Sequence, residues 1–361
     1  MWHKIRNTIA ATALFFIAFT PISLAEEPAH NHEPKAKGLN VGEMIMHHIS
    51  DAHEWEFAHG VAIPLPVIIY TADRGLEVFS SSHFYHNPVA GHEHVYKHED
   101  YILEHEHIYR ATASGEVDKS VQVWDFSITK NVASMLLSAV LLVLIFGAVA
   151  KGYATNRGKA PKGIQAVIEP IILFIRDEVI KPSIGVGYER FAPYLLTLFF
   201  FIFINNLLGL IPGGANLTGN IAVTLVLALL TFIIVHISAN KHYYMHLLKP
   251  TGVPIALLPI MVPVEIVGVF MKPFSLMIRL FANITAGHII ILSLLGLIFI
   301  ARDLGGAGTG LAVSPLVLVF TLFMNLIELL VAFLQAFIFT LLTSMYIGSA
   351  VENNHEADHG H

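Results

Sequence analysis

Six strongly polar side chains lie in the last three apolar segments of this 361-residue chain, 253–271, 273–301 and 311–350, and could do chemistry there. Four are ionisable and two are amides: Glu265, Arg279, His288 and Glu328, with Asn283 and Gln335. A charged group at membrane depth costs on the order of 3 kcal/mol or more, and such groups are generally functional. A structural pair between helices would explain any one of them. Several together favour a site that handles ions.

The spacing of these residues predicts how they meet. Asn283 lies one helical turn after Arg279, and Gln335 lies seven residues after Glu328, so each pair shares a helix face. In an antiparallel hairpin, the residue numbers of facing positions have a nearly constant sum. If Gln335 faces Arg279, His288 must then lie close to Glu328. We predict two polar levels, stacked about 10–13 Å apart along the helices.

The two levels suit different chemistry. A His–Glu pair in a low-dielectric site can hold and pass a proton, because each group shifts the proton affinity of the other. The guanidinium of Arg279 stays charged and cannot do so. At mid-membrane it would repel free cations and attract a carboxylate presented by a neighbouring helix. An acid approaching it must release its proton, as a machine with two half-channels and a moving carboxylate requires.

The composition places these residues in a membrane. Hydrophobic residues make up 55% of the chain and charged residues 13%, about half the charged share of globular proteins. The ranges 132–150, 191–240 and 304–327 contain no Asp, Glu, Lys or Arg. Uncharged apolar stretches of about 20 residues are typical of membrane-spanning helices. The chain is therefore expected to be an integral membrane protein.

We predict an all-α polytopic membrane protein with about five transmembrane helices. The expected spans are 130–150, 191–211, 220–240, 273–301 and 311–350, with a Pro-broken apolar segment at 253–271. The Gly/Thr linker 305–310 makes the last two spans a long antiparallel hairpin. Residues 164–179 are apolar on one face only, which predicts an amphipathic helix on the membrane surface. The membrane domain is expected over 129–351.

The N-terminus resembles a secretory signal peptide. Lys4 and Arg6 precede the apolar run 9–22, and residues 23–25 resemble a small-residue cleavage site. We interpret 1–25 as a signal peptide, with an uncleaved anchor helix as the alternative. Either interpretation places the following residues outside the cytoplasm.

Residues 26–128 are expected to form a small His-rich extracytoplasmic α+β domain. The apolar runs 66–70 and 76–79 flank a turn-like segment at 72–75, which predicts a β-hairpin, and 121–124 is a third strand candidate. The chain has no cysteine, so no disulfide stabilises this domain.

The loop 151–162 is basic and therefore expected in the cytoplasm. Five spans from an external N-terminus would then place the tail 352–361 in the cytoplasm as well. No internal repeat is evident, which disfavours an inverted-repeat transporter.

Thirteen histidines lie between His30 and His107, some in His-Glu-His triplets. Such spacing suits zinc or copper, and buffering near a proton entrance is another interpretation. A solvated surface with biased composition is the simplest interpretation. We assign no metal site and no cofactor to the chain.

Three longer motifs contain or flank the polar residues. The segment Phe274–Asn283 resembles the arginine motif of F-type ATP synthase subunit a, and Leu334–Thr340 is similar to the last-helix motif of that family. Asn206–Pro212 resembles the end of its second span. The resemblance covers about 130–350. The combination is specific, whereas an isolated R-L-x-x-N would be a weak signal.

This resemblance implies roles for the polar residues. Arg279 would separate two proton half-channels and face the carboxylates of a ring of c subunits. The residues Asn283, Gln335 and Glu265 would line the ion path. His288 and Glu328 match a coupled pair that has the carboxylate first and the imidazole second in some members. In this chain the order is reversed: the imidazole of His288 comes first and the carboxylate of Glu328 second.

The resemblance also implies partners and a location. The partners are the c-subunit ring, the b subunits of the peripheral stalk, the remaining ATP synthase subunits and the lipid membrane, with no nucleic acid. The location is the bacterial inner membrane, where proton flow would drive ring rotation and ATP synthesis. Nothing in the chain looks like a phosphate-binding loop, so we expect no catalytic site on it.

The main alternative is a metal-ion transporter whose His-rich domain collects the metal. A cation path should, however, show clustered His and Asp ligands and no unpaired arginine. A purely structural membrane scaffold is a further alternative. A scaffold would not need the alignment that places Arg279 opposite Gln335 and His288 opposite Glu328.

Overall fold

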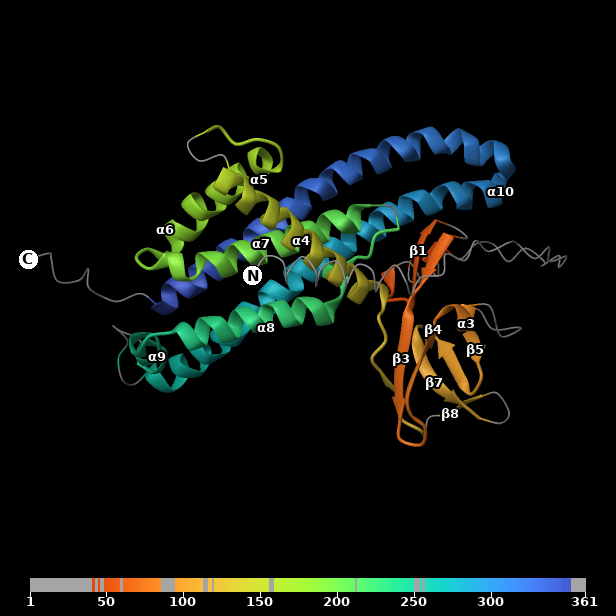
Figure 1. Cartoon of the computed structure of the whole chain (residues 1–361), viewed down its shortest axis with the longest axis horizontal. Helices are drawn as coiled ribbons and strands as arrows, with labels where there is room; N and C mark the ends of the chain where they lie inside the picture. The colour runs from red at the N-terminus through yellow and green to blue at the C-terminus, as the bar shows by residue number, and fades with distance from the viewer. Residues whose placement is uncertain are drawn as a thin grey trace, which may run out of the picture. The chain divides into compact units, whose positions relative to one another are not determined.

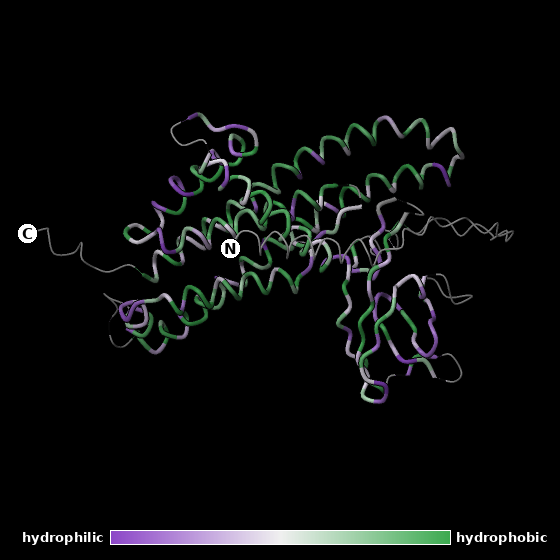
Figure 2. Tube along the Cα trace, viewed as in Figure 1, coloured by the Kyte–Doolittle hydropathy of each residue, from purple (hydrophilic) through white to green (hydrophobic). Residues whose placement is uncertain are grey.

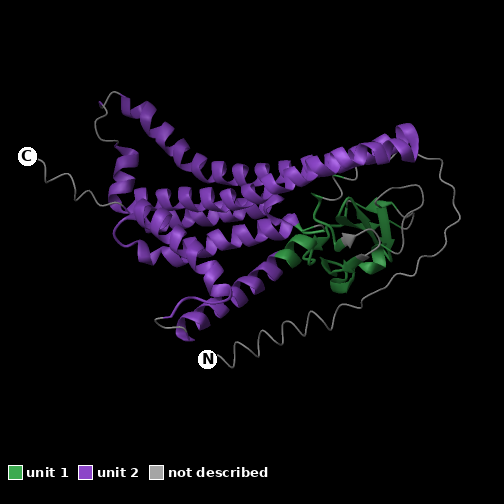
Figure 3. Ribbon diagram, turned by 90° about the horizontal axis from the view of Figure 1, so that it is seen from above, with its two compact units in different colours: residues 1–134, 211–215 green, residues 135–210, 216–361 purple. Residues whose placement is uncertain are grey.

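The structure is a computed structural model of the chain (Figure 1). It describes residues 41–351 except for 43–44, 46–48, 59–60, 86–94, 113–115, 119, 156–158, 212, 250–253 and 255–256. The predicted signal peptide, the tail 352–361 and the triplet at 92–94 lie outside the described residues. The chain forms two compact units, which Figure 3 distinguishes by colour: 1–134 with 211–215, and 135–210 with 216–361.

The first unit contains short antiparallel sheets. One sheet pairs β1 (Glu54–Ala58) with β2 (Val61–Pro64). A second has the order β4-β3-β9, from β3 (Pro66–Thr71), β4 (Gly75–Ser80) and β9 (Trp124–Asp125). A third has the order β5-β6-β7-β8, from β5 (Val95–His98), β6 (Tyr101–Glu104), β7 (His107–Ala111) and β8 (Val117–Asp118). The short helix α3 (Ser82–Tyr85) follows β4. The unit is thus an α+β domain.

The predicted hairpin at 66–79 is confirmed. Strands β3 and β4 pair in unbroken register from Pro66 with Ser80 to Thr71 with Gly75. Gly75 has a φ of 79°, a left-handed conformation that glycine adopts without steric cost. The third strand was misplaced, because the pairing segment is Trp124–Asp125 rather than 121–124. The inward side chains Val67 and Ile69 join a small apolar core.

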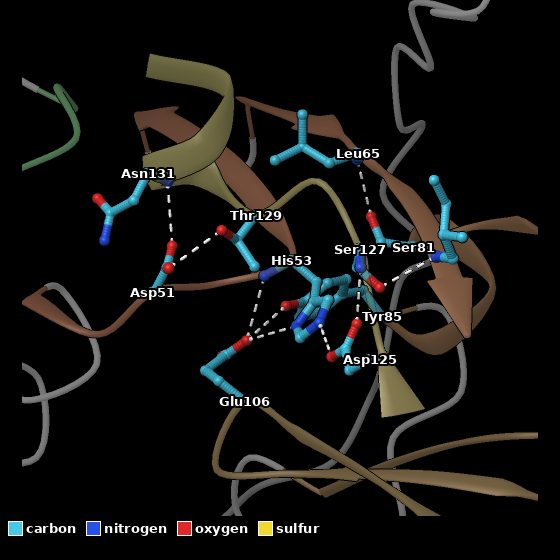
Figure 4. A network of polar contacts seen from close by, with 11 residues as sticks. Asp51, His53, Leu65, Ser81, Tyr85, Glu106, Asp125, Ser127, Thr129 and Asn131 are labelled. Atoms are coloured by element: carbon cyan, nitrogen blue, oxygen red, sulfur yellow. Dashed lines mark hydrogen bonds and ion pairs between the residues drawn. The ribbon is translucent and has the colours of Figure 1, made fainter. Parts of the chain in front are cut away.

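A buried polar network holds this unit together (Figure 4). His53 is 1% exposed, and its Nε2 lies 3.0 Å from a carboxylate oxygen of Asp125. Its Nδ1 lies 3.5 Å from Glu106, which also accepts a hydrogen bond from the Tyr85 hydroxyl at 3.2 Å. The imidazole therefore lies between two carboxylates from different parts of the unit.

The same unit includes the first turn of the helix that follows it. Asp51 accepts hydrogen bonds from the Thr129 hydroxyl and from the backbone N–H of Asn131, both at 3.0 Å. The backbone N–H of Lys130 donates to the carbonyl of Ala52 at 2.9 Å. The bonds from Lys130 and Asn131 satisfy backbone N–H groups at the helix start, which have no partner within the helix.

Two ionisable groups make the stability of this unit depend on pH. Burial lowers the pKa of His53, but the hydrogen bonds and charges of Asp125 and Glu106 outweigh burial and raise the pKa to about 9. Burial, together with Glu56 and Glu106, raises the pKa of Glu54 to about 7. In both cases the folded state binds the proton more tightly than the unfolded chain, so stability falls as pH rises. The Glu54 contribution is lost between pH 4.5 and 7, and the His53 contribution between pH 6.5 and 9.

We expect His53→Gln to destabilise this unit by about 3 kcal/mol near pH 6 and to remove its alkaline loss of stability. Thermal unfolding of the full chain from pH 6 to 9.5 tests this, followed by tryptophan fluorescence. All three tryptophans, Trp2, Trp55 and Trp124, precede the membrane helices. His107→Gln, at an exposed histidine, is the control. Equal pH curves for both variants would contradict the assignment.

The second unit is helical. Its elements are α4 (Lys130–Thr155), which begins in the first unit, α5 (Ile164–Phe174), a π-helix (Ile175–Ile180), α6 (Lys181–Ile184), a 3-10 turn (Tyr188–Arg190), α7 (Ala192–Leu210), a 3-10 turn (Leu217–Gly219), α8 (Ile221–Ser238), α9 (Lys241–Leu248) and α10 (Leu258–Val351). Among the described residues, α4, α7, α8 and α10 are long and apolar enough to cross a membrane. Figure 2 shows the long hydrophobic stretches along them.

The helix α10 is the predicted hairpin, with two differences. The segment 253–271, expected to be broken by prolines, is helical from Leu258 onward, and the helix continues through Pro263 and Pro273 into the next predicted span. A proline removes one helical hydrogen bond, but in an apolar environment breaking further backbone bonds would cost more. The linker 305–310 is also not a loop. Only Gly306 leaves the helical conformation.

Gly306 turns the chain back because its φ of 80° is accessible to glycine and strained for other residues. The hydroxyl of Thr309 lies 3.0 Å from the Ala301 carbonyl oxygen and 2.8 Å from that of Gly306, so its one hydrogen is shared between them. This contact helps to satisfy the carbonyl groups at the turn. The two arms of α10, before and after Gly306, are therefore joined by a one-residue turn.

The predicted amphipathic helix is built from α5, the π-helix and α6. Most of the apolar face expected for it packs on the hydrophobic core of the unit, namely Ile168, Ile171, Ile172, Ile175 and Val179. Ile164, expected on the same face, is instead 51% exposed. Gly348 of α10 lies so close to the Ser183 carbonyl that a side chain there would collide with it. Asn240 caps the end of α10, because its N–H and its side-chain amide donate to the carbonyls of Ala350 and Val351.

Candidate functional site

The two arms of α10 bring Arg279, Asn283 and Gln335 together, as their spacing predicts. Gln335 is 3% exposed, and its amide donates to the backbone carbonyl of Arg279 at 2.6 Å. Its own carbonyl oxygen accepts from the Asn283 amide at 3.2 Å. A buried amide needs such partners, because an unsatisfied one costs about 1–3 kcal/mol. Gln335 thus supports the backbone of Arg279 and leaves the guanidinium free.

The side chain of Arg279 is exposed on the outer surface of the hairpin. In the described part of the chain, no acidic side chain lies within ion-pair distance of its guanidinium. Exposed apolar residues flank it, with Phe274 and Ile278 at 51% and 38% exposure. An unpaired cation on an apolar membrane face attracts an external carboxylate.

His288 and Glu328 form the second level. Nδ1 of His288 lies 2.6 Å from Oε1 of Glu328, and the side chains are 12% and 5% exposed. Neither atom makes a hydrogen bond of ordinary geometry with a described residue. Gly287 provides the space for this carboxylate, since a Cβ at Gly287 would lie 2.9 Å from Oε1. The predicted proximity of the pair is confirmed.

The helix α7 completes the second level. Nε2 of His288 lies 3.2 Å from the carbonyl oxygen of Gly209. That oxygen can only accept, so Nε2 carries a hydrogen when the imidazole is neutral. The lone pair of Nδ1 then faces Glu328. This arrangement can share a proton between Nδ1 and Oε1.

A buried polar connection that the sequence pattern did not predict lies beside this pair. The amide of Asn206 on α7 donates to the Ala332 carbonyl at 3.1 Å, and its oxygen accepts from the Thr218 hydroxyl at 2.7 Å. Asn206 and Thr218 are 3% and 1% exposed. Adjacent asparagines within an uncharged apolar span were a sequence signal for this connection, but Asn206 was noted only as part of a motif.

The structure does not bring Glu265 to the other polar residues. It lies on the first arm of α10, 14 residues before Arg279, which is about 21 Å along the helix. Seven residues after it, Nζ of Lys272 lies 5.2 Å from the centre of the Tyr346 ring. A small cavity there is lined by residues of α8, α9 and α10, including His236, Lys272 and Tyr346. Glu265 thus belongs to a separate region of the hairpin.

The described residues contain no group of three or more His, Asp or Glu side chains suited to a metal ion. The His92-Glu93-His94 triplet is outside that set. No observation on the described residues favours the metal-transporter alternative.

Comparison with known proteins gives consistent matches. A sequence profile for the family described as ATP synthase A chain matches residues 132–348, and one for a domain of unknown function matches 44–126. The chain is 41% identical to ATP synthase subunit a 2 of Chlorobaculum tepidum, over 99% of this chain and 84% of that protein. It is 46% identical to ATP synthase subunit a of Chloroherpeton thalassium, over 66% of this chain and 71% of that protein.

A further relative covers most of the N-terminal unit as well. ATP synthase subunit a of Chlorobium phaeobacteroides is 40% identical over 89% of this chain and 79% of that protein. The similarity therefore extends beyond the membrane helices.

Proposed function

Because the chain belongs to the ATP synthase A chain family, we propose that it forms two proton half-channels beside a ring of c subunits. Proton flow through them is coupled to ring rotation and ATP synthesis. One observation carries this proposal: an exposed, unpaired Arg279 lies one level from the buried His288–Glu328 pair. The nucleotide chemistry belongs to other subunits of the complex.

The outer half-channel uses the His288–Glu328 pair. A proton from the extracytoplasmic side is held between Nδ1 and Oε1, 2.6 Å apart, while the Gly209 carbonyl keeps the other ring nitrogen engaged. Asn206 and Thr218 continue the polar path next to it. From the pair the proton passes to a ring carboxylate, which enters the lipid in neutral form because burial disfavours its charge.

Arg279 separates the half-channels. A protonated ring carboxylate that reaches the guanidinium loses its proton, because a nearby positive charge favours the ionised form. The same charge repels a proton moving directly between the half-channels. Asn283 and Gln335 hold the helix backbone at this level, and Glu265 lines the cytoplasmic half-channel.

Partners and sidedness follow from the same proposal. The b subunits brace the chain against the turning ring, within a bacterial inner membrane. The N-terminal unit lies outside the cytoplasm and the C-terminal tail inside it. Five crossings, with each arm of α10 crossing once, satisfy this arrangement.

Disulfide crosslinking tests the placement of Arg279. The chain has no cysteine, so single cysteines can be introduced on the exposed positions around Arg279, namely Ser275, Ile278, Ala282 and Ala286. We expect each to crosslink to a cysteine beside the ring carboxylate of a c subunit. Leu280 and Ile284, which are buried on the opposite face, are the matched controls. Absence of crosslinks from every exposed position in assembled complexes would refute this placement.

A further inference from the structure

One face of the β4-β3-β9 sheet is apolar and exposed. Successive side chains of a strand point to opposite faces, and Val67, Ile69 and Thr71 are fully buried on the inner one. The outer face carries six apolar residues, five on the three strands and one directly after β9: Ile68, Tyr70, Leu76, Val78, Trp124 and Phe126. Leu76, Val78 and Phe126 are more than 60% exposed.

These six residues, here called the outer apolar face, form one continuous patch. Tyr70 pairs with Leu76 on one side and with Trp124 on the other. In the next row, Ile68 pairs with Val78, and its carbonyl accepts from the N–H of Phe126 at 2.8 Å. Glu77 and Asp125, charged residues of these strands, pair with Ile69 and therefore point to the inner face of the sheet. An uncharged patch of this kind marks an interaction surface.

Hydrogen bonds place the outer apolar face beside the start of a membrane helix. After Phe126, the N–H of Ile128 donates to the Pro66 carbonyl at 3.1 Å, and the N–H of Lys130 donates to the Ala52 carbonyl at 2.9 Å. Asp51 binds the first turn of α4. The chain from the patch to the helix is therefore fixed within the first unit rather than loosely linked.

This connection limits the distance between the patch and the bilayer. The uncharged stretch of α4 begins at residue 132, so the first turn of the helix lies at the membrane surface. Phe126 precedes Lys130 by four residues, a reach of at most about 14 Å. The outer apolar face is thus within reach of the lipid headgroup layer, whichever side of the membrane it is on.

We propose that the outer apolar face lies in the headgroup layer of the membrane and anchors the N-terminal unit to phospholipid next to α4. Its composition fits this occupant. Trp and Tyr are enriched at membrane interfaces, where the rings meet the acyl chains and the polar Trp N–H and Tyr O–H groups meet the headgroups. The six residues carry no charge that would require a complementary partner protein.

Site-directed spin labelling tests the anchor. Single cysteines at Leu76, Val78 and Trp124 are labelled with a nitroxide in the full chain, reconstituted in vesicles of phosphatidylcholine and phosphatidylglycerol. Lys97 and His107, exposed on the β5-β6-β7-β8 sheet, are the controls. We expect the ratio of oxygen to aqueous-nickel accessibility to be several-fold higher on the outer apolar face than at the controls. Unchanged tryptophan fluorescence confirms that the variants at Leu76, Val78, Lys97 and His107 are folded. The variant at Trp124 loses one of the three tryptophans, so an unchanged circular dichroism spectrum is the check for it.

Three outcomes would overturn the proposal. Equal nickel accessibility at the test and control positions would place the face in water. Dipolar broadening between labels at low lipid content would identify a second copy of the chain as the occupant. If the labels are shielded from both oxygen and nickel only in the assembled ATP synthase, the occupant of the face is another subunit.

Discussion

Replacing Arg279 with alanine is expected to abolish ATP-driven proton pumping while the complex remains assembled. The guanidinium is exposed and makes no ion pair with a described residue, so its removal breaks no ion pair within the described part of the chain. Gln335 binds the backbone carbonyl at this position, and this bond survives the substitution. The substitution should therefore abolish proton transport and leave folding and assembly unchanged.

Pumping can be followed by quenching of a pH-sensitive dye in inverted membrane vesicles, with assembly checked by native electrophoresis. Arg302→Ala is a matched control, because this arginine is also exposed on the first arm but lies near the turn at Gly306. Arg279→Lys keeps the charge and loses the planar fork of donors, so it should pump poorly. Persistent pumping by Arg279→Ala would refute the role given to this residue.

Exchanging His288 and Glu328 together is expected to preserve more proton transport than either single exchange. The two side chains meet at 2.6 Å in a buried site. His288→Glu alone would place two carboxylates there, and Glu328→His alone would place two imidazoles. Leaving a buried charge without its partner costs about 3–5 kcal/mol. The double exchange restores an opposite pair but loses the bond from the imidazole to Gly209, so recovery should be incomplete.

The comparison requires all four proteins of a double-mutant cycle, because only the cycle isolates the coupling between the two residues. Proton-driven ATP synthesis in vesicles is the readout, normalised to the amount of assembled complex. A coupling energy near zero, with the double variant no better than the worse single variant, would show that the two residues do not act as a pair.

The spacing of residues along the sequence was sufficient to predict contacts within regular elements. The spacing of Arg279, His288, Glu328 and Gln335 predicted both contacts between the arms of α10, because the register of an antiparallel hairpin is set once one pair is aligned. The hairpin of β3 and β4 followed from alternating apolar residues around a turn ending in glycine. The family resemblance was carried by motifs on the same helices.

Backbone continuity was harder to predict. The prolines of residues 253–271 suggested a broken segment, yet the first arm of α10 begins at Leu258 and runs through Pro263 without a break. The residues 305–310 suggested a loop, yet Gly306 alone makes the turn. Local propensity indicates where a helix is weakened. Whether it breaks depends on the hydrogen bonds that the surroundings can replace.

The chain sequence by itself therefore determined a membrane protein, a pair of polar levels and the family of the chain. Only the tertiary structure decided which distant groups complete them. Gly209 and Asn206 come from α7, far from α10 in sequence, and His53 meets Glu106 and Asp125 across the N-terminal unit. The reason is physical: a periodic element fixes the spacing of its own side chains, whereas contacts between separate elements are set by how their surfaces pack.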